Sequence, residues 1–479
     1  MSNSLMTLIL CLCIVSIVHG QEIDEEAHES AKEQAIADLQ VGNQSPIIGS
    51  SSRLSDVAIP LQTKTMSGRN GPLIEIGDPF LGTGAISQGF DIGTGAIWNP
   101  RFYVFGTFRT AVQGFDDGDE FRTEWVNRLD LFGNLQLTST ERILIGFRPF
   151  DFRGREFTGY TFGPESDDGF NEGFNGRITT LFFEGDIGEI FPGLDASESS
   201  FADFGFAIGR QELVIQRGLL IDDTVDAFGL TRNTIVFDGV ANLRMAFYYA
   251  WNQVNRSDRA LDNQADLFGL FNEADFGDST VAVDLALVTS TDDDSNGFYF
   301  GISATQRFGH LNTTFRFLGS IPLEEESAKT QDGFLLFAEL SWTPTGTEDL
   351  YYVNAFLGID DFSSAARAPD RSGPLARTGI LYAAQGLGRF GSALNAEPAD
   401  SVGLSVGRQF FWNDFRDQLI LEAGGRIRTV DDSPGAVAVG ARYQHAMGAN
   451  FILQVDLHAT VRDERKPGYG IRMELLIKF

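Results

Sequence analysis

The chain has 479 residues, a formal charge of -30 and a pI of about 4.4, and this charge excludes general nucleic-acid binding because it repels phosphate at long range. Both cysteines, Cys11 and Cys13, lie close to the N-terminus, so the rest of the chain holds neither disulfides nor thiolate metal sites. The 42 Phe and 53 Gly, with mean hydropathy near zero, are unusual for a soluble domain. A barrel that turns aromatic side chains toward lipid accounts for them.

Residues 1–20 contain no acidic or basic side chain apart from His19, are largely apolar from Leu5 to Val18, and end in Val18-His19-Gly20. This pattern predicts a secretory signal peptide cleaved after Gly20. A membrane anchor is the second interpretation, because an apolar stretch of about fourteen residues is short for a bilayer. The next segment, 21–95, is first acidic and then rich in Ser and Gly, which predicts a periplasmic N-terminal extension.

Beyond the signal peptide we find no run of about eighteen apolar residues, so transmembrane helices are not expected. Instead, segments of roughly ten residues alternate apolar and polar side chains between clusters of Gly, Asp, Asn, Ser and Pro. The segment 451–462 is the clearest, with Leu453 and Leu457 on one face and Asp456 on the other.

This alternation predicts an all-β protein: a transmembrane antiparallel up-and-down β-barrel over residues 96–479. Its strand number is about 16–18, because single-chain bacterial barrels have even numbers of strands. A soluble β-sandwich would also alternate, but it rarely has so many strands in one domain. The barrel is therefore the preferred interpretation.

The last segment alternates from Tyr469 to the terminal Phe479, with Arg472 and Glu474 on its polar face. It resembles the C-terminal assembly signature of outer-membrane barrels, an amphipathic strand that ends in an aromatic residue. The resemblance implies recognition by the barrel-assembly machinery through this strand, and a Gram-negative outer membrane with its lipid and lipopolysaccharide as surroundings.

Nearly all basic residues are arginines, and many fall on the polar parity of the predicted strands. A guanidinium group stays charged and presents a planar fork of donors, so luminal arginines can bind carboxylates weakly at many points. The candidates for the lumen are Arg122, Arg128, Arg244, Arg316, Arg426, Arg442 and Arg472. The alternative is that they pair with wall carboxylates such as Glu339 and Asp456 and only stiffen the barrel.

Acidic stretches at 116–120 and 292–294 raise the question of calcium, but they lack the spaced ligands and distal Glu of an EF-hand. Of the five histidines only His458 is expected in the lumen, and no nucleophile is paired with it. The sequence thus predicts no metal, no cofactor and no enzyme activity.

One stretch carries a family resemblance: Gly209-Arg210-Gln211 is followed by Arg217, Asp222-Asp223 and Asp226-Ala227. It is similar to the motif of the alginate-export outer-membrane porin family, and Gly407-Arg408-Gln409 repeats its opening. The resemblance implies an 18-strand barrel that passes an anionic polysaccharide. In physical terms, the five charged residues Arg210, Arg217, Asp222, Asp223 and Asp226 would form a luminal ion-pair lattice at a constriction.

The preferred hypothesis is an outer-membrane channel for small hydrophilic, anionic solutes or oligosaccharides, with arginines as selectivity groups. Two alternatives remain open. The barrel would be a scaffold sheathing a partner such as a multihaem cytochrome, or it would be a structural or adhesin barrel whose lumen is closed by loops.

Overall fold

The computed structural model describes residues 71–80, 87–116, 118, 120–151, 157–194, 203–291, 295–324, 327, 329–430, 435–463 and 465–479. The predicted signal peptide, residues 21–70 of the predicted extension and the acidic stretch 292–294 lie outside these ranges. The described residues all belong to one compact unit.

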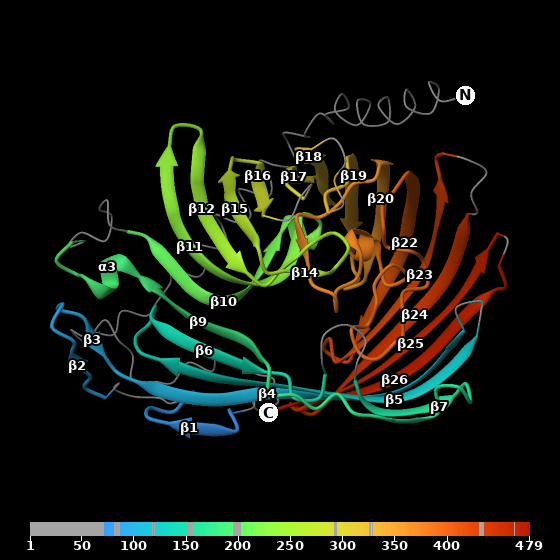
Figure 1. Ribbon diagram of the computed structural model, residues 1–479, viewed down its shortest axis with the longest axis horizontal. Helices are drawn as coiled ribbons and strands as arrows, with labels where there is room; N and C mark the ends of the chain where they lie inside the picture. Colours follow the sequence, from blue (N-terminus) through green and yellow to red (C-terminus); the bar gives the residue numbers. More distant parts are fainter. Residues whose placement is uncertain are drawn as a thin grey trace, which may run out of the picture. The chain divides into compact units, whose positions relative to one another are not determined.

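The unit is a closed antiparallel β-barrel of 18 strands, which confirms the predicted all-β fold and decides the strand number (Figure 1). The barrel strands are β4 (Arg101–Asp116), β5 (Phe121–Gln136), β6 (Arg142–Phe147), β9 (Ile178–Asp186), β10 (Gly205–Ile215), β11 (Ile221–Phe237), β12 (Val240–Asn252), β15 (Ala265–Asp275), β16 (Ser279–Ser290), β17 (Gly297–Phe308), β18 (Leu311–Pro322), β19 (Gly333–Trp342), β20 (Leu350–Asp360), β22 (Ser401–Trp412), β23 (Asp417–Arg428), β24 (Ala436–Met447), β25 (Phe451–Arg462) and β26 (Gly468–Lys478). The ring closes where β26 pairs with β4.

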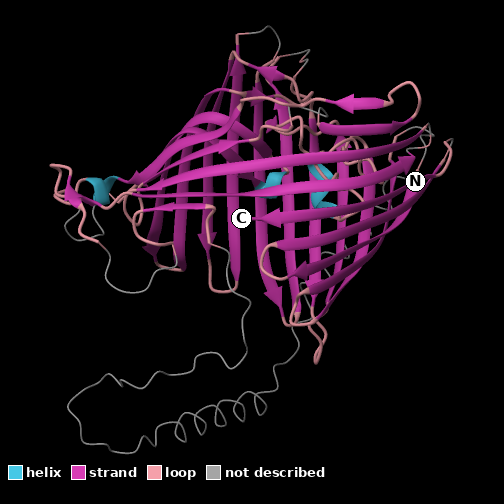
Figure 2. Cartoon of the chain, turned by 90° about the horizontal axis from the view of Figure 1, so that it is seen from below, coloured by secondary structure: helices cyan, strands magenta, loops and turns pink. Residues whose placement is uncertain are grey.

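Shorter elements complete the described chain. They are β1 (Ile74–Ile76), β2 (Phe90–Asp91), β3 (Ile97–Trp98), β7 (Thr158–Gly163), β8 (Gly169–Asn171), α3 (Ile187–Ile190), η1 (Gln216–Gly218), β13 (Val254–Asn255), β14 (Leu261–Asp262), β21 (Ala366–Arg367) and η2 (Pro374–Thr378). None of the helices in the described ranges is both long and apolar enough to cross a membrane. Strands dominate the molecule; some short helical segments overlap the strands in the middle of the view, and another lies at its left-hand edge (Figure 2).

The short strand β1 lies within the predicted N-terminal extension and adds to the sheet beside β4. It pairs with β4 from Phe102 to Val104, whereas β26 pairs with β4 only from Thr107 onward. The two therefore occupy the same side of β4, one beyond the other. The backbone N–H of Gly106, between them, donates a hydrogen bond of 2.8 Å to the carbonyl of Phe479.

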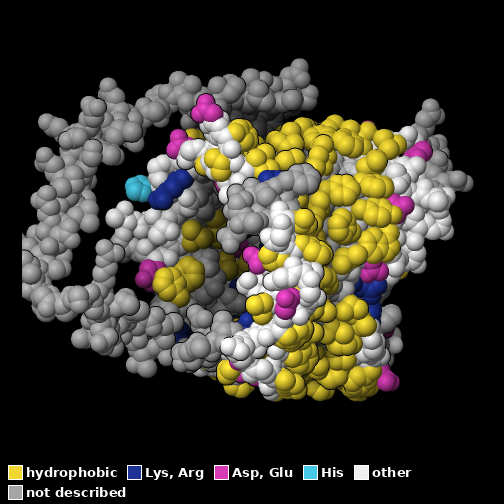
Figure 3. Space-filling model, turned by 90° about the vertical axis from the view of Figure 1, so that its left-hand side faces the viewer, with side chains coloured by type: hydrophobic (Ala, Val, Ile, Leu, Met, Phe, Trp, Pro, Cys, Tyr) yellow, Lys and Arg dark blue, Asp and Glu magenta, His cyan; other side chains and the backbone are white. Residues whose placement is uncertain are grey.

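The outer face of the barrel is apolar and the inner face is polar, the reverse of a soluble sheet. On β26, Ile471 and Met473 are exposed, whereas Arg472 and Glu474 between them are buried. This follows from the strand's period of two, which sends neighbouring side chains to opposite faces. Apolar side chains spread widely over the outer surface in Figure 3. The outer face is thus suited to lipid, as expected for a transmembrane barrel.

Single cysteines test the register of the strands. Leu457 is 46% exposed on the outer face, whereas Arg244 is exposed inside the barrel, in the cavity described below. We expect a charged, lipid-impermeant thiol reagent to modify Leu457→Cys much more slowly than Arg244→Cys in a membrane-embedded protein, because lipid covers only the first. Faster labelling at position 457 would show that the two faces are assigned wrongly.

Candidate functional site

The interior of the barrel contains the 361–400 loop, which connects β20 to β22. This loop reaches wall strands far away in the sequence: the guanidinium of Arg389 forms an ion pair of 2.6 Å with Glu124 on β5. Its backbone also accepts a hydrogen bond of 3.3 Å from Thr460 on β25, at the carbonyl of Ala393. Sequence reasoning left the lumen as either open or closed by loops, and the loop's inward course was not predicted.

Wall side chains satisfy the polar backbone of this loop. The carboxylate of Glu422 on β23 accepts hydrogen bonds from the backbone N–H groups of Ile380 at 2.9 Å and Leu381 at 3.0 Å. On β5, another part of the wall, Arg128 donates to the carbonyl of Gly386 at 3.0 Å. Buried backbone groups need such partners, so many polar wall residues hold the loop in place. Holding the loop is a structural role, whereas the sequence alone predicts only that these residues face the lumen.

A second element turns inward: the hairpin formed by the end of β10 and the start of β11. Gly209 has a φ of 125°, and a Cβ at this position would collide with the carbonyl of Leu181 on β9. Glycine is therefore required where β10 leaves the wall. Directly after it, Arg210 and Asp226 form a two-point ion pair of 2.7 and 2.9 Å across the base of the hairpin. In Figure 1, β10 runs from β9 toward the middle of the barrel.

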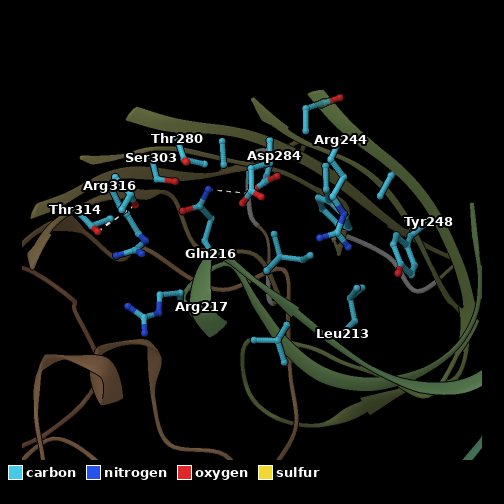
Figure 4. Close-up of a pocket in the computed structure, with 18 of the residues that line it drawn as sticks. Leu213, Gln216, Arg217, Arg244, Tyr248, Thr280, Asp284, Ser303, Thr314 and Arg316 are labelled. Carbon is cyan, nitrogen blue, oxygen red and sulfur yellow. Dashed lines mark hydrogen bonds between the residues drawn. The ribbon is translucent and has the colours of Figure 1, made fainter. Parts of the chain in front are cut away.

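The tip of this hairpin, η1, contacts two wall strands, β16 and β19. The side-chain amide of Gln216 donates to Asp284 on β16 at 2.7 Å (Figure 4). The guanidinium of Arg217 lies 3.2 Å from the carboxylate of Glu339 on β19. The 361–400 loop joins the same place, because Arg377 donates to the carbonyl of Arg217 at 2.9 Å. The tip and the loop together form a partition across the lumen.

Beside the tip lies a cavity of about 610 Å³, which we call the tip cavity. Its polar lining includes Arg217, Arg244, Arg316, Thr280, Ser303, Thr305 and Thr314. Arg316 is held by Glu339, but the side chain of Arg217 is 59% exposed. Arg244 is exposed and makes no ion pair with any residue that the structure describes. Two cationic groups are thus available to a solute in this cavity.

A second cavity, of about 360 Å³, lies among residues of the 361–400 loop, and we call it the loop cavity. Asp370 and Arg371 both line it. Burial, the largest influence on Asp370, would raise its pKa, but Arg148, Arg371 and Arg128 outweigh burial and lower the pKa. Burial likewise opposes the charge of Arg371, but Asp222, Asp370 and Glu212 raise its pKa. Both groups therefore stay charged beside the cavity.

The predicted lattice of the family-like segment forms only in part. Arg210 pairs with Asp226 as expected, but Arg217 points away from the three aspartates and toward Glu339. Asp222 instead lies 3.4 Å from Arg371 of the loop, and Asp223 accepts hydrogen bonds of 2.7 Å from the backbone and side chain of Asn255. The inward hairpin separates residues that a flat wall would have kept together.

The other predicted arginines mostly have structural partners. The pairs are Arg122 with Asp167, Arg128 with Asp130, Arg316 with Glu339, Arg442 with Asp456, and Arg472 with Asp456 and Glu474, while Arg426 donates to the carbonyls of Asn395 and Glu397. Of the sequence candidates, Arg217 and Arg244 remain the ones most open to a solute. Arg371 and Arg389 were not predicted, because no sequence pattern indicates that their loop enters the barrel.

The repeated motif at Gly407-Arg408-Gln409 does not have the same structural role. Arg408 shares the outer parity of β22 with the exposed Val406 and Trp412. Its guanidinium lies 4.8 Å from the ring centre of Tyr351 and pairs with Asp349 at 2.7 Å. Arg210 faces inward, so the two motifs agree in sequence only.

Asp151 gives the loop cavity a pH response. Burial, with help from Asp370 and Asp130, raises the pKa of Asp151 to about 6 against the opposing effects of Arg128 and Arg148. We expect anion preference to fall as the pH rises from about 5 to about 7, because ionised Asp151 adds negative charge to the cavity. Because folding raises the pKa of Asp151, the free energy of unfolding also decreases as the pH rises from about 5 to about 7. Reversal potentials at several pH values measure the change in anion preference, and this change should disappear in Asp151→Asn. If Asp151→Asn keeps the pH dependence of the unmodified protein, Asp151 is not the responsible group.

Within the described ranges, no group of three or more His, Cys, Asp or Glu side chains is arranged to hold a metal ion. The site is therefore characterised by arginines, carboxylates and hydroxyl groups around two cavities in a partitioned lumen. These groups can attract and orient a charged solute.

Comparison with known proteins gives a structural match without a sequence match. No family model and no curated protein matches the chain. The outer membrane protein OpdK from Pseudomonas aeruginosa is similar in structure, with a TM-score of 0.53 and 11% identity over 78% of this chain and 98% of that one. A BenF-like porin from Pseudomonas fluorescens Pf-5 has a TM-score of 0.53 and 10% identity over 79% and 99%.

The chain has the fold of an outer-membrane porin. A structure of OpdK with vanillate is also similar, with a TM-score of 0.52 and 11% identity over 78% of this chain and 98% of that chain. The Pseudomonas fluorescens neighbour is described as a porin, and OpdK as an outer membrane protein. They support a porin fold, but they do not support the alginate-export family in particular.

Proposed function

We propose that the protein is an outer-membrane channel through which small organic anions diffuse. The tip cavity carries this proposal, because Arg217 and Arg244 present charge to its interior beside a row of hydroxyl groups. A guanidinium group binds a carboxylate through two parallel hydrogen bonds, and hydroxyl groups can replace part of the solute's hydration. Nearby carboxylates such as Glu212 and Glu273 limit the net attraction. Binding of this kind is weak enough to allow release, as conduction requires.

The dimensions of the lumen favour small solutes over a polymer or a protein partner. The tip cavity of about 610 Å³ and the loop cavity of about 360 Å³ lie in the range of small-molecule sites. The 361–400 loop occupies the space that a sheathed cytochrome or an extended polysaccharide would need. One OpdK structure contains vanillate, a carboxylate. We extend that solute class, and not that compound, to this chain.

The proposed orientation follows the usual rule for such barrels, with short turns in the periplasm and longer loops outside. The turn between β11 and β12, at 238–239, then lies in the periplasm with β1 and the 21–95 extension. The 361–400 loop enters from the outside. The C-terminal strand ending at Phe479 would be the segment that the barrel-assembly machinery recognises.

Planar-bilayer recording of the purified protein tests the proposal. We expect discrete conductance steps, a reversal potential that indicates anion preference in a KCl gradient, and a lower chloride current when benzoate is added, because a carboxylate competes at Arg217 and Arg244. A sealed structural barrel gives no steps. A conducting channel that prefers cations and ignores benzoate would refute the proposed solute class.

A further inference from the structure

The wall of the barrel is interrupted next to the inward hairpin. β7 pairs with β5 and with β8, and β9 pairs with β6 and with the first half of β10. Among the described residues, no paired positions join β7 or β8 to β9 or β10. An uninterrupted barrel would have a continuous ladder of hydrogen bonds here. The interruption thus leaves a notch in the wall, which we define as the space between β8 and the β10–β11 hairpin.

The sequence builds this notch in two ways. β9 begins only at Ile178, and Gly209 turns β10 away from the wall, so that residues 211–215 pair with β11 and not with β9. β11 leaves as well: its pairing with β12 shifts in register at Asp226, opposite Asn252. Two neighbouring strands are therefore withdrawn from the same part of the wall.

Next to β9 and β11, which border the notch, lies a small cavity that we call the passage. The passage has a volume of about 60 Å³ and is lined by Ile178 and Thr179 of β9, Thr224 of β11 and loop residues 368–371. It shares Pro369, Asp370 and Arg371 with the loop cavity. The charged residues that line it are Arg148, Arg177, Arg210, Arg371, Asp223 and Asp370. Arg148, Arg210 and Arg371 already pair with Asp130, Asp226 and Asp222, so an acidic group in the passage would share their guanidinium groups with these carboxylates.

The outer lip of the notch is apolar. Trp125 of β5 is exposed on the outer face, Tyr160 of β7 lies directly opposite it, and Phe170 of β8 lies opposite Tyr160. Residues directly opposite one another in a ladder share a face, so Phe170 points outward, and it is 60% exposed. Phe174, just beyond β8, is 56% exposed and packs edge-on against Phe150 at 5.2 Å.

We propose that the notch is a side opening through which an amphipathic acid, with an acidic head and an aliphatic tail, passes between the loop cavity and the surrounding lipid. The inference rests on the proposed channel function and adds a lateral route and a solute class to it. The arginines of the passage hold the acidic head, and the phenylalanines of the lip contact the tail.

Thiol access from the lipid phase tests the side opening. Natural cysteines occur only at positions 11 and 13, so Thr224→Cys places one reporter in the passage. We expect decyl methanethiosulfonate, dissolved in the bilayer, to modify Cys at 224 at a rate approaching that of lipid-facing Leu457→Cys. Thr305→Cys, in the tip cavity away from the notch, is the matched control and should react far more slowly. Equal rates at positions 224 and 305 would overturn the side opening.

Competition tests the solute class. Decyl sulfonate should slow modification at position 224, whereas uncharged decanol should not, because only the first carries an acidic head for the arginines. If decyl sulfonate and decanol slow the modification equally, the proposed solute class is wrong. If Thr224→Cys does not fold, Thr179→Cys in the same passage serves for both measurements. Conductance measured on the same samples distinguishes the two proposals. A protein that conducts but is not modified at position 224 from the lipid disproves only the side opening. A protein that is modified there but does not conduct disproves only the channel.

Discussion

Replacing residues 366–397 with a short Gly-Ser linker should raise the single-channel conductance several-fold. This segment carries the loop residues that contact β5, β23 and β25 inside the barrel, including Arg389, Leu381 and Ala393. Its removal opens the lumen to water, and the wall carboxylates that held it, such as Glu422, become hydrated. The closed ladder of 18 strands does not depend on the loop, so the barrel should still form.

Tyr382→Phe is the matched control for this deletion. It removes only the hydroxyl that donates to the carbonyl of Gly425 at 2.8 Å and leaves the loop in place. We expect its conductance to equal that of the unmodified protein. Heat-modifiable migration in electrophoresis verifies that each barrel is folded. A folded deletion variant with unchanged conductance would show that the loop does not limit flow.

Changing both Arg217 and Arg244 to Ala should move the channel from anion toward cation preference. These two arginines are the exposed cations of the tip cavity, whereas Glu212, Glu273 and Glu339 remain nearby. A charge in a narrow, partly desolvated site acts over a short distance with little screening, so removing two of them should change the sign of the local field. The reversal potential in a salt gradient measures this change.

Two other arginines serve as comparisons for the double variant. Arg408→Ala removes a cation from the lipid-facing surface, so selectivity should stay the same. Arg210→Ala breaks the ion pair with Asp226 at the base of the hairpin, and we expect lower stability. An unchanged reversal potential in a folded Arg217 and Arg244 double variant would remove the tip cavity from the selectivity site.

The strands could be predicted because their signal is local. The predicted segment 451–462 coincides with β25, since alternation alone determines which residues face lipid. Strand number was harder to obtain, because one position in the wall is shared by β6 and β7, which both pair with β5. That division depends on pairing between distant strands, and a single strand's pattern does not contain it.

The site could be predicted less well than the barrel because it depends on where segments bend inward. Arg210 and Arg408 follow the same Gly-Arg-Gln order, yet one faces the lumen and the other lipid. Parity depends on the register of each strand, and a motif of three residues does not fix it. The 361–400 loop has no periodicity that would indicate its course, because its partners are distant wall residues such as Glu124.

The 361–400 loop also bridges the seam where the first and last barrel strands meet. Arg109 of β4 donates to the carbonyl of Gln385 at 3.2 Å, and Thr460 of β25, next to β26, donates to Ala393. These two partners come together only when β26 has paired with β4. Complete docking of the loop therefore requires the closed ring, and we expect the loop to narrow the barrel only after β26 has paired with β4.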